Sequence, residues 1–268
     1  MDIFQAIILG IIEGITEFLP ISSTGHLLIA QNMIGYKDTA EIFTVVVQLG
    51  ALGAVVWFYR QDLWEKITSL INGNKVQQKF LLFWFIATIP ASIFGFLLSK
   101  TLPYIDSPRV IAVTLILGGL LIWLIENHFD SAPVTKQPKL NKINLKQSIL
   151  IGFSQVLALI PGVSRSGATI MGGLLTGLDR VTATTFSFYL SIPIILMAGL
   201  YKLISSNGNL TSVSGGGIAL IMGTLSAFVT SFIVIKWLLK YVSKHDFKIF
   251  AYYRIVLGIV ILIMLITR

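Results

Sequence analysis

Long apolar runs dominate this chain, and short segments in which charged residues gather separate them. A helix needs about 20 residues to cross a hydrocarbon core of about 30 Å. Six of the runs are about that long, so we expect six transmembrane helices. They cover residues 42–59, 80–99, 109–126, 181–203, 215–238 and 249–267.

Four other apolar segments are too short to cross, because a helix rises only about 1.5 Å per residue. Pro20 and Pro161 divide them into two pairs, since proline lacks an N–H and pushes the preceding residue out of helical geometry. Each pair predicts a re-entrant hairpin that enters the membrane partway and returns on the same side. Such irregular backbone is tolerated only inside protein or beside an aqueous cavity. The pairs are 4–19 with 22–34, and 147–160 with 164–178.

The two hairpins resemble each other in sequence. A shift of 142 residues superimposes five pairs of small or polar residues, with the prolines one position out of step. The pairs are Gly10 and Gly152, Glu13 and Gln155, Ser22 and Ser164, Thr24 and Ser166, and Gly25 and Gly167. Three spans follow each hairpin, and this odd number of crossings inverts the second copy. We therefore predict an all-α polytopic membrane protein with an inverted-topology internal repeat. Its single domain has copies at about 1–128 and 146–268.

Composition agrees with a membrane protein, since 12% of the residues are charged and 55% are hydrophobic, whereas about a quarter are charged in globular chains. The net charge of +8 could indicate nucleic acid. However, lysines gather in three connecting segments that the topology places on one side, namely 60–79, the linker 128–146, and 236–248. Basic loops are typically cytoplasmic, so we expect no nucleic-acid partner. Both termini and the mouth of the first hairpin are then expected outside. The chain has no cysteine, which excludes disulfides and thiolate chemistry.

The hairpin tips carry the residues of an anion site. Ser22 and Ser164 lie where helix N-caps belong, so each tip offers backbone N–H groups and the positive end of a helix dipole. Two such ends aimed at one point favour phosphate. Arg165 adds a fork of donors, and its burial in a membrane is costly enough to favour a functional role. The serines alone could simply be caps. The candidate phosphate-binding residues are Ser22, Ser23, Thr24, Gly25, Ser164, Arg165, Ser166 and Gly167.

The first hairpin also carries acid–base groups that the second lacks. Glu13 and Glu17 are four residues apart and share a helix face, and His26 follows the tip. The two carboxylates could bind a divalent cation, or one could orient His26. A histidine beside a serine can serve as general base or attack phosphorus itself. The second copy has Gln155, Leu159 and Ala168 at the corresponding positions.

These residues carry a family resemblance. The stretches Glu13-Gly-Ile-Thr-Glu-Phe-Leu-Pro-Ile-Ser-Ser-Thr-Gly-His26 and Pro161-Gly-Val-Ser-Arg-Ser-Gly-Ala-Thr169 resemble the signature motifs of the undecaprenyl-diphosphate phosphatases of the bacitracin-resistance type. Phe43-Thr-Val-Val-Val-Gln-Leu-Gly50 is also similar to that family. The motif spacing and the number of helices agree over essentially the whole chain.

The resemblance implies a phosphatase of the bacterial plasma (inner) membrane with its active site open to the outside. It would remove the terminal phosphate of a C55 polyprenyl diphosphate and recycle the lipid carrier for cell-wall synthesis, which confers bacitracin resistance. It also implies a divalent cation (Mg²⁺ or Ca²⁺), for which Glu13 and Glu17 are the candidate ligands. The family's essential residues map onto Glu13, Glu17, Ser23, His26 and Arg165.

Two alternatives stay open at this point. Ser23 could attack the terminal phosphorus with His26 or Glu17 as base, or His26 could be the nucleophile. The protein could also be a polyprenyl-phosphate transporter or flippase, because inverted repeats with broken helices are common in transporters. The unshared glutamates and histidine favour the phosphatase. We expect Arg254 to snorkel or to pair structurally, and the sequence permits a homodimer.

Overall fold

The computed structural model describes residues 1–36, 38, 41–99, 107–128, 137–205 and 215–267, and within these ranges it contains helices and no strand. Five described helices are long and apolar enough to cross a membrane, and α3 (Ile42–Phe58) adds a sixth span if it is joined to the helix after it. The five are α5 (Lys75–Leu98), α7 (Pro108–His128), α10 (Arg180–Ser205), α11 (Gly216–Val242) and α12 (Lys248–Ile266). The predicted all-α polytopic fold is confirmed.

The segment after α3 is helical, which the sequence did not predict. We expected 60–79 to be a connecting segment, but α4 occupies Arg60–Ile71 and is bent by 68° from α3. Its alternating polar and apolar residues hide it from a search for apolar runs. Asn74 then begins α5 earlier than expected, because its side chain accepts hydrogen bonds from the first amides of that helix.

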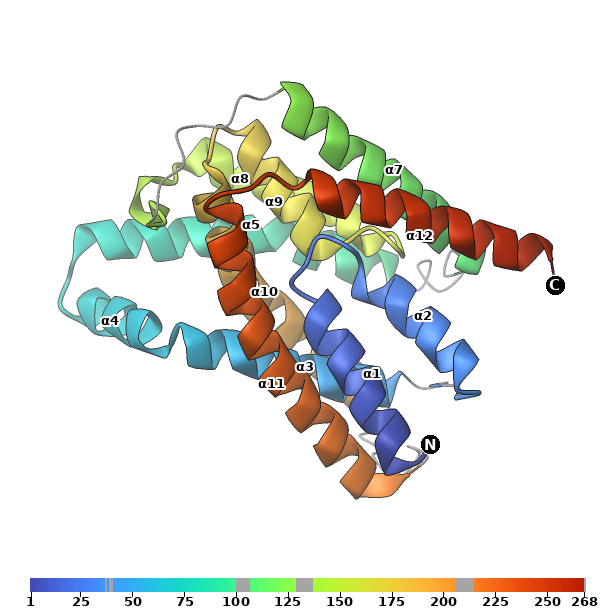
Figure 1. The fold of residues 1–268 in the computed structure, drawn as a ribbon. Helices are drawn as coiled ribbons and strands as arrows, with labels where there is room; N and C mark the ends of the chain where they lie inside the picture. Colours follow the sequence, from blue (N-terminus) through green and yellow to red (C-terminus); the bar gives the residue numbers. More distant parts are fainter. Residues whose placement is uncertain (37, 39–40, 100–106, 129–136, 206–214, 268) are drawn as a thin grey trace.

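The two predicted hairpins are present, each broken next to its proline (Figure 1). The first consists of α1 (Ile3–Thr16) and α2 (Ser23–Met33). The second consists of α8 (Leu145–Val156), a short 3₁₀ turn (Leu157–Leu159) and α9 (Arg165–Leu175). All four helices are too short to cross a membrane.

The two hairpins are held in shape by the same hydrogen bond. In the first, the Gln5 side chain donates to the Ile34 carbonyl at 3.5 Å, and in the second, Gln147 donates to the Thr176 carbonyl at 3.0 Å. Both glutamines also close capping boxes at the starts of α1 and α8. The donors and the acceptors both follow the 142-residue shift, which supports the predicted internal repeat.

Helices of the first half pack against helices of the second half. The helix α1 packs along α11 of the second half, and α8 packs along α5 of the first, while α3 packs on α10 and α7 on α12. The contacts are close: a Cβ on Gly10 would meet the carbonyl oxygen of Gly223, and a Cβ on Gly152 would lie 2.7 Å from that of Ala87. Each hairpin therefore depends on a span from the other half.

The hairpins enter from opposite ends of the helix bundle. Met1 lies beside Gly215 at the end where Glu41 and Lys202 form an ion pair of 2.7 Å. At the other end, Glu126 pairs with Arg180 and joins the end of α7 to the start of α10. The described parts of the three lysine-rich segments lie at this second end, which we call the basic end; residues 129–136 of the linker lie outside the described residues. Its cytoplasmic assignment stays a prediction.

Arg254 of α12 joins the two hairpin tips. Its side chain is buried, with the residue 2% exposed, and it donates to the carbonyl oxygens of Pro20 and Gly162, both at 3.2 Å. These two acceptors are repeat equivalents, 142 residues apart. It also donates to the carbonyl of Thr114 at 3.2 Å. Arg254 therefore does not snorkel, and its expected structural role is to hold the tips together.

Replacing Arg254 with methionine is expected to destabilise the protein. The substitution leaves buried carbonyls without donors, each at about 1–3 kcal/mol, so the melting temperature in detergent should fall by roughly 5 °C or more. Arg109→Met, at an exposed position on α7, is the matched control and should change it little. Equal melting temperatures for both variants would contradict the proposed role of Arg254.

Candidate active site

The hairpin tips lie side by side, as predicted, and serine hydroxyls of the second tip bind the first. Ser166 Oγ donates to the carbonyl of Leu19 at 2.8 Å. Ser164 caps α9 by accepting the Gly167 amide at 3.1 Å, which confirms its predicted capping position. Ser164, Ser166 and Gly167 of the second tip therefore bind protein groups in this structure, and the contact of Ser166 with Leu19 joins the two tips.

The first tip is arranged differently from the second. Ser22 precedes α2, but its side chain makes no capping bond and its backbone has φ 70°, a strained value for a residue with a side chain. No side chain therefore caps the first amides of α2, which suits an anion. In the first turn of α2, Thr24 is exposed, whereas Gly25 is buried against Leu115.

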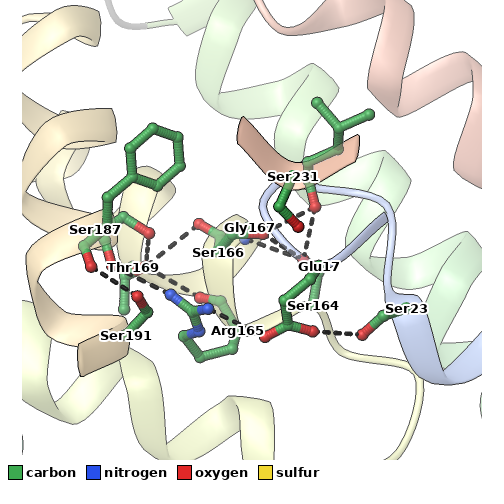
Figure 2. A network of polar contacts seen from close by, with 12 residues as sticks. Glu17, Ser23, Ser164, Arg165, Ser166, Gly167, Thr169, Ser187, Ser191 and Ser231 are labelled. Atoms are coloured by element: carbon green, nitrogen blue, oxygen red, sulfur yellow. Dashed lines mark hydrogen bonds and ion pairs between the residues drawn. The ribbon is translucent and has the colours of Figure 1, made fainter. Parts of the chain in front are cut away.

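Glu17 lies between the catalytic candidates of the two hairpins (Figure 2). Ser23 Oγ donates to its Oε2 at 2.7 Å, and Arg165 donates to its Oε1 at 3.1 Å. Arg165 is oriented further by the Ser187 carbonyl at 3.0 Å and by the ring of Phe18, 5.8 Å below the guanidinium. One carboxylate therefore holds a potential nucleophile and a phosphate-binding cation next to each other.

His26 faces away from this group. Its Nδ1 lies 2.7 Å from the Ser22 carbonyl oxygen, and its Nε2 lies 2.6 Å from the hydroxyl of Tyr253, against which the ring stacks. Among the described residues it forms no hydrogen bond with Ser23 or Glu17. Sequence reasoning missed Tyr253, because nothing near it in the chain marks its contact with the first hairpin.

Glu13 is the second carboxylate of the site. It is 1% exposed, and neither of its oxygens has a hydrogen-bond partner in the described part of the chain. Buried carboxylate oxygens without donors suit a cation. Within the described ranges, no three acidic, histidine or cysteine side chains gather into a metal site. A cation held by Glu13 and Glu17 would therefore complete its shell with water and phosphate oxygens, as Mg²⁺ usually does.

A cavity of about 590 Å³ leads to Glu17 and Arg165. The ion pair of Glu41 and Lys202 lies in its lining, at the start of α3 and near the end of α10, and most other lining side chains are apolar. Gln155 also lines it, although that residue is 1% exposed and both of its amide atoms lack partners in the described structure. Gln155 is not among the site residues that the sequence predicts. The feature of the sequence that could have identified Gln155 is its alignment with Glu13 under the 142-residue shift.

Comparison with known proteins shows the family of the chain. Residues 6–260 match the family described as bacitracin resistance protein BacA. The chain belongs to this family.

Similar proteins cover almost the whole chain. An undecaprenyl-diphosphatase of Methylobacillus flagellatus is 46% identical, with 98% of each chain aligned. The undecaprenyl-diphosphatase 3 of Acinetobacter baylyi is 44% identical over 98% of this chain and 97% of its own. The undecaprenyl-diphosphatase 2 of Shewanella oneidensis is 42% identical over 96% of both. Membership of the BacA family therefore applies to both hairpins and to the spans that hold them.

Replacing Gln155 with leucine is expected to raise the stability of the protein while it lowers the affinity for pyrophosphate. Removal of a buried unpaired amide should raise the melting temperature, because such groups cost about 1–3 kcal/mol. Affinity for inorganic pyrophosphate, measured by calorimetry, should fall roughly tenfold, since one hydrogen bond to a charged group is lost. Gln77→Leu is the control, because Gln77 has an unpaired buried Oε1 outside the cavity. Unchanged pyrophosphate affinity in Gln155→Leu would exclude this residue from binding.

Proposed function

We propose that the protein is an integral membrane phosphatase that hydrolyses undecaprenyl (C55 polyprenyl) diphosphate to the monophosphate and inorganic phosphate. The observation that carries the proposal is a largely apolar cavity that reaches Glu17 and Arg165, with Ser23 hydrogen-bonded to that same Glu17. An amphiphile with a diphosphate head and a polyprenyl tail has the same distribution of charge and apolar surface. The names of the relatives support the same activity.

In the proposed reaction, Ser23 Oγ attacks the terminal phosphorus while its proton passes to Glu17 Oε2, with which it is hydrogen-bonded. The bond from phosphorus to the bridging oxygen breaks, and the polyprenyl monophosphate leaves. Water then hydrolyses the phosphoserine to release inorganic phosphate. The hydrogen bond between Ser23 and Glu17 favours Ser23 as the nucleophile. His26 is the rival nucleophile, but it is hydrogen-bonded to Ser22 and Tyr253.

Arg165 and the first amides of α2 bind the phosphate oxygens in this proposal. The ion pair between Arg165 and Glu17 keeps the guanidinium in place before substrate arrives, so binding requires little reorganisation. A divalent cation, Mg²⁺ or Ca²⁺, held by Glu13 and Glu17 would neutralise charge on the transferring phosphoryl group. His26 is assigned to positioning the first tip through its contacts with Ser22 and Tyr253.

We place the protein in the plasma (inner) membrane of a bacterium, with both termini and the cavity on the outer side. The concentration of lysine at the opposite, basic end supports this orientation, because cytoplasmic loops are rich in lysine. In that setting the product would serve as carrier in peptidoglycan synthesis, and faster recycling would confer bacitracin resistance. A homodimer stays a prediction.

Replacing Glu17 with alanine should abolish phosphate release. Loss of a general base lowers the rate by about 10²–10⁴-fold, so release from C55 diphosphate by purified protein should fall at least roughly 100-fold. Glu41→Gln removes another acid that lines the same cavity and should retain most activity. A carrier without hydrolysis would release no phosphate even as wild type, and full activity in Glu17→Ala would contradict the assigned site.

The nature of the phospho-enzyme tests the choice of nucleophile. Rapid quenching during turnover should trap a phosphate on Ser23 that survives acid and is lost in alkali, and Ser23→Ala should form none. His26→Gln should still form it at a reduced rate. A trapped phosphate that is stable in alkali and labile in acid would identify phosphohistidine and reverse the two assignments.

Replacing Glu13 with glutamine should weaken binding of the cation. Millimolar Mg²⁺ or Ca²⁺ with inorganic phosphate should raise the melting temperature of the wild type, since a ligand that binds only the folded state stabilises it. We expect most of this increase to disappear in Glu13→Gln and to persist in Glu65→Gln, an exposed position on α4. The same increase in all three proteins would place the cation elsewhere.

A further inference from the structure

A second hollow lies at the basic end of the molecule. Its volume is about 360 Å³, and its polar lining includes Tyr59, Lys66, Lys139, Asn141, Lys142 and Thr185. Tyr59 follows the end of α3, and Thr185 lies near the start of α10. The active-site cavity opens beside the opposite ends of these same helices, and the two lining sets share no residue.

The hollow carries an excess of positive charge. Lys66 is 6% exposed, pairs with Asp62 at 3.1 Å and lies 4.9 Å from the centre of the Phe80 ring. Lys139 and Lys142 form no ion pair with any described residue. Asp62 thus offsets one of the three lysines that line the hollow, and two charges are left for a ligand. Lys139 and Lys142 are exposed at the mouth of the hollow, where an anion that enters it can reach both charges.

Neutral donors accompany the lysines. The hydroxyl of Tyr59 is buried and lies within interaction range of the Thr185 side chain. The amide of Asn141 and the hydroxyl of Thr185 belong to the same lining. Ammonium groups beside hydroxyl and amide donors match the several acceptor oxygens of a phosphate group.

We propose that this hollow binds a phosphate group at the basic end, carried either by an anionic lipid headgroup or by free phosphate. Basic pockets between membrane helices bind lipid phosphates in this way. The site is separate from the proposed phosphatase site and does not depend on it. Arg165 of the active site donates to the Ser187 carbonyl, two residues from Thr185 of the hollow, so the two sites lie on neighbouring parts of α10 although their linings share no residue.

Native mass spectrometry of the detergent-purified full chain tests the proposal. The probes are dioleoyl phosphatidate and dioleoyl phosphatidylcholine at equal concentrations. Wild type should retain phosphatidate in preference to phosphatidylcholine, and K139Q/K142Q should lose that preference by about tenfold. K139R/K142R keeps the charge and should keep the preference. Phosphatase activity of both variants should match the wild type, which distinguishes failure of this proposal from failure of the proposed function.

K236Q/K240Q is the matched control, because it removes two lysines of α11 at the same end but outside the hollow. Equal losses in the two glutamine variants, or no loss in either, would overturn the proposal. Inorganic phosphate, added as a competitor, distinguishes the sources of the ligand. Displacement of phosphatidate by inorganic phosphate identifies a site for the phosphate group alone, whereas retention of phosphatidate identifies a lipid site. Either result supports a phosphate-binding hollow, provided that K139Q/K142Q has lost its preference for phosphatidate.

Discussion

The ion pair between Glu17 and Arg165 is the interaction on which the site depends. The two side chains are 5% and 13% exposed and belong to hairpins that enter from opposite ends of the bundle. Either charge alone would be costly at this depth. Together they satisfy each other and place Ser23 beside the position that a phosphate bound to Arg165 would take. The pair therefore couples the meeting of the two halves to the assembly of the reactive groups.

The exchange of helices between the halves explains how two short hairpins can persist inside a membrane protein. A hairpin that ends partway leaves backbone groups unsatisfied at its tip. Here the carbonyls of Leu19, Pro20 and Gly162 accept hydrogen bonds from Ser166 and Arg254. The serines of the second hairpin are thus bound to protein, whereas its Arg165 pairs with Glu17 of the first. The first has no side-chain cap on α2, and in the proposed mechanism its amides and two carboxylates take part in the reaction.

Much of this architecture could be predicted from the sequence because it depends on local properties. Apolar length predicted five of the spans and the apolar part of the sixth, and the 142-residue shift predicted the repeat. Pro20 and Pro161 marked the breaks, whereas Pro90 and Pro193 lie inside continuous helices. A proline alone therefore does not end a membrane helix, and the short apolar segments on both sides were the decisive signal.

The remaining features depend on contacts between distant segments. Tyr253 meets His26 across 227 residues, and Arg254 reaches both tips from the last helix. The serines of the second tip could not be separated into caps and ligands before their partner Leu19 was known. The helix α4 was missed because its polar residues interrupt the apolar pattern.

A double-mutant cycle on Glu17 and Arg165 tests most directly whether the two hairpins form one catalytic unit. The values of kcat/KM for phosphate release would be compared for wild type, Glu17→Gln, Arg165→Gln and the double variant. Residues that act as a unit show strongly non-additive losses. We predict that kcat/KM of the double variant is about as low as that of the more impaired single variant. Losses that multiply would contradict this account and indicate that the two residues act independently.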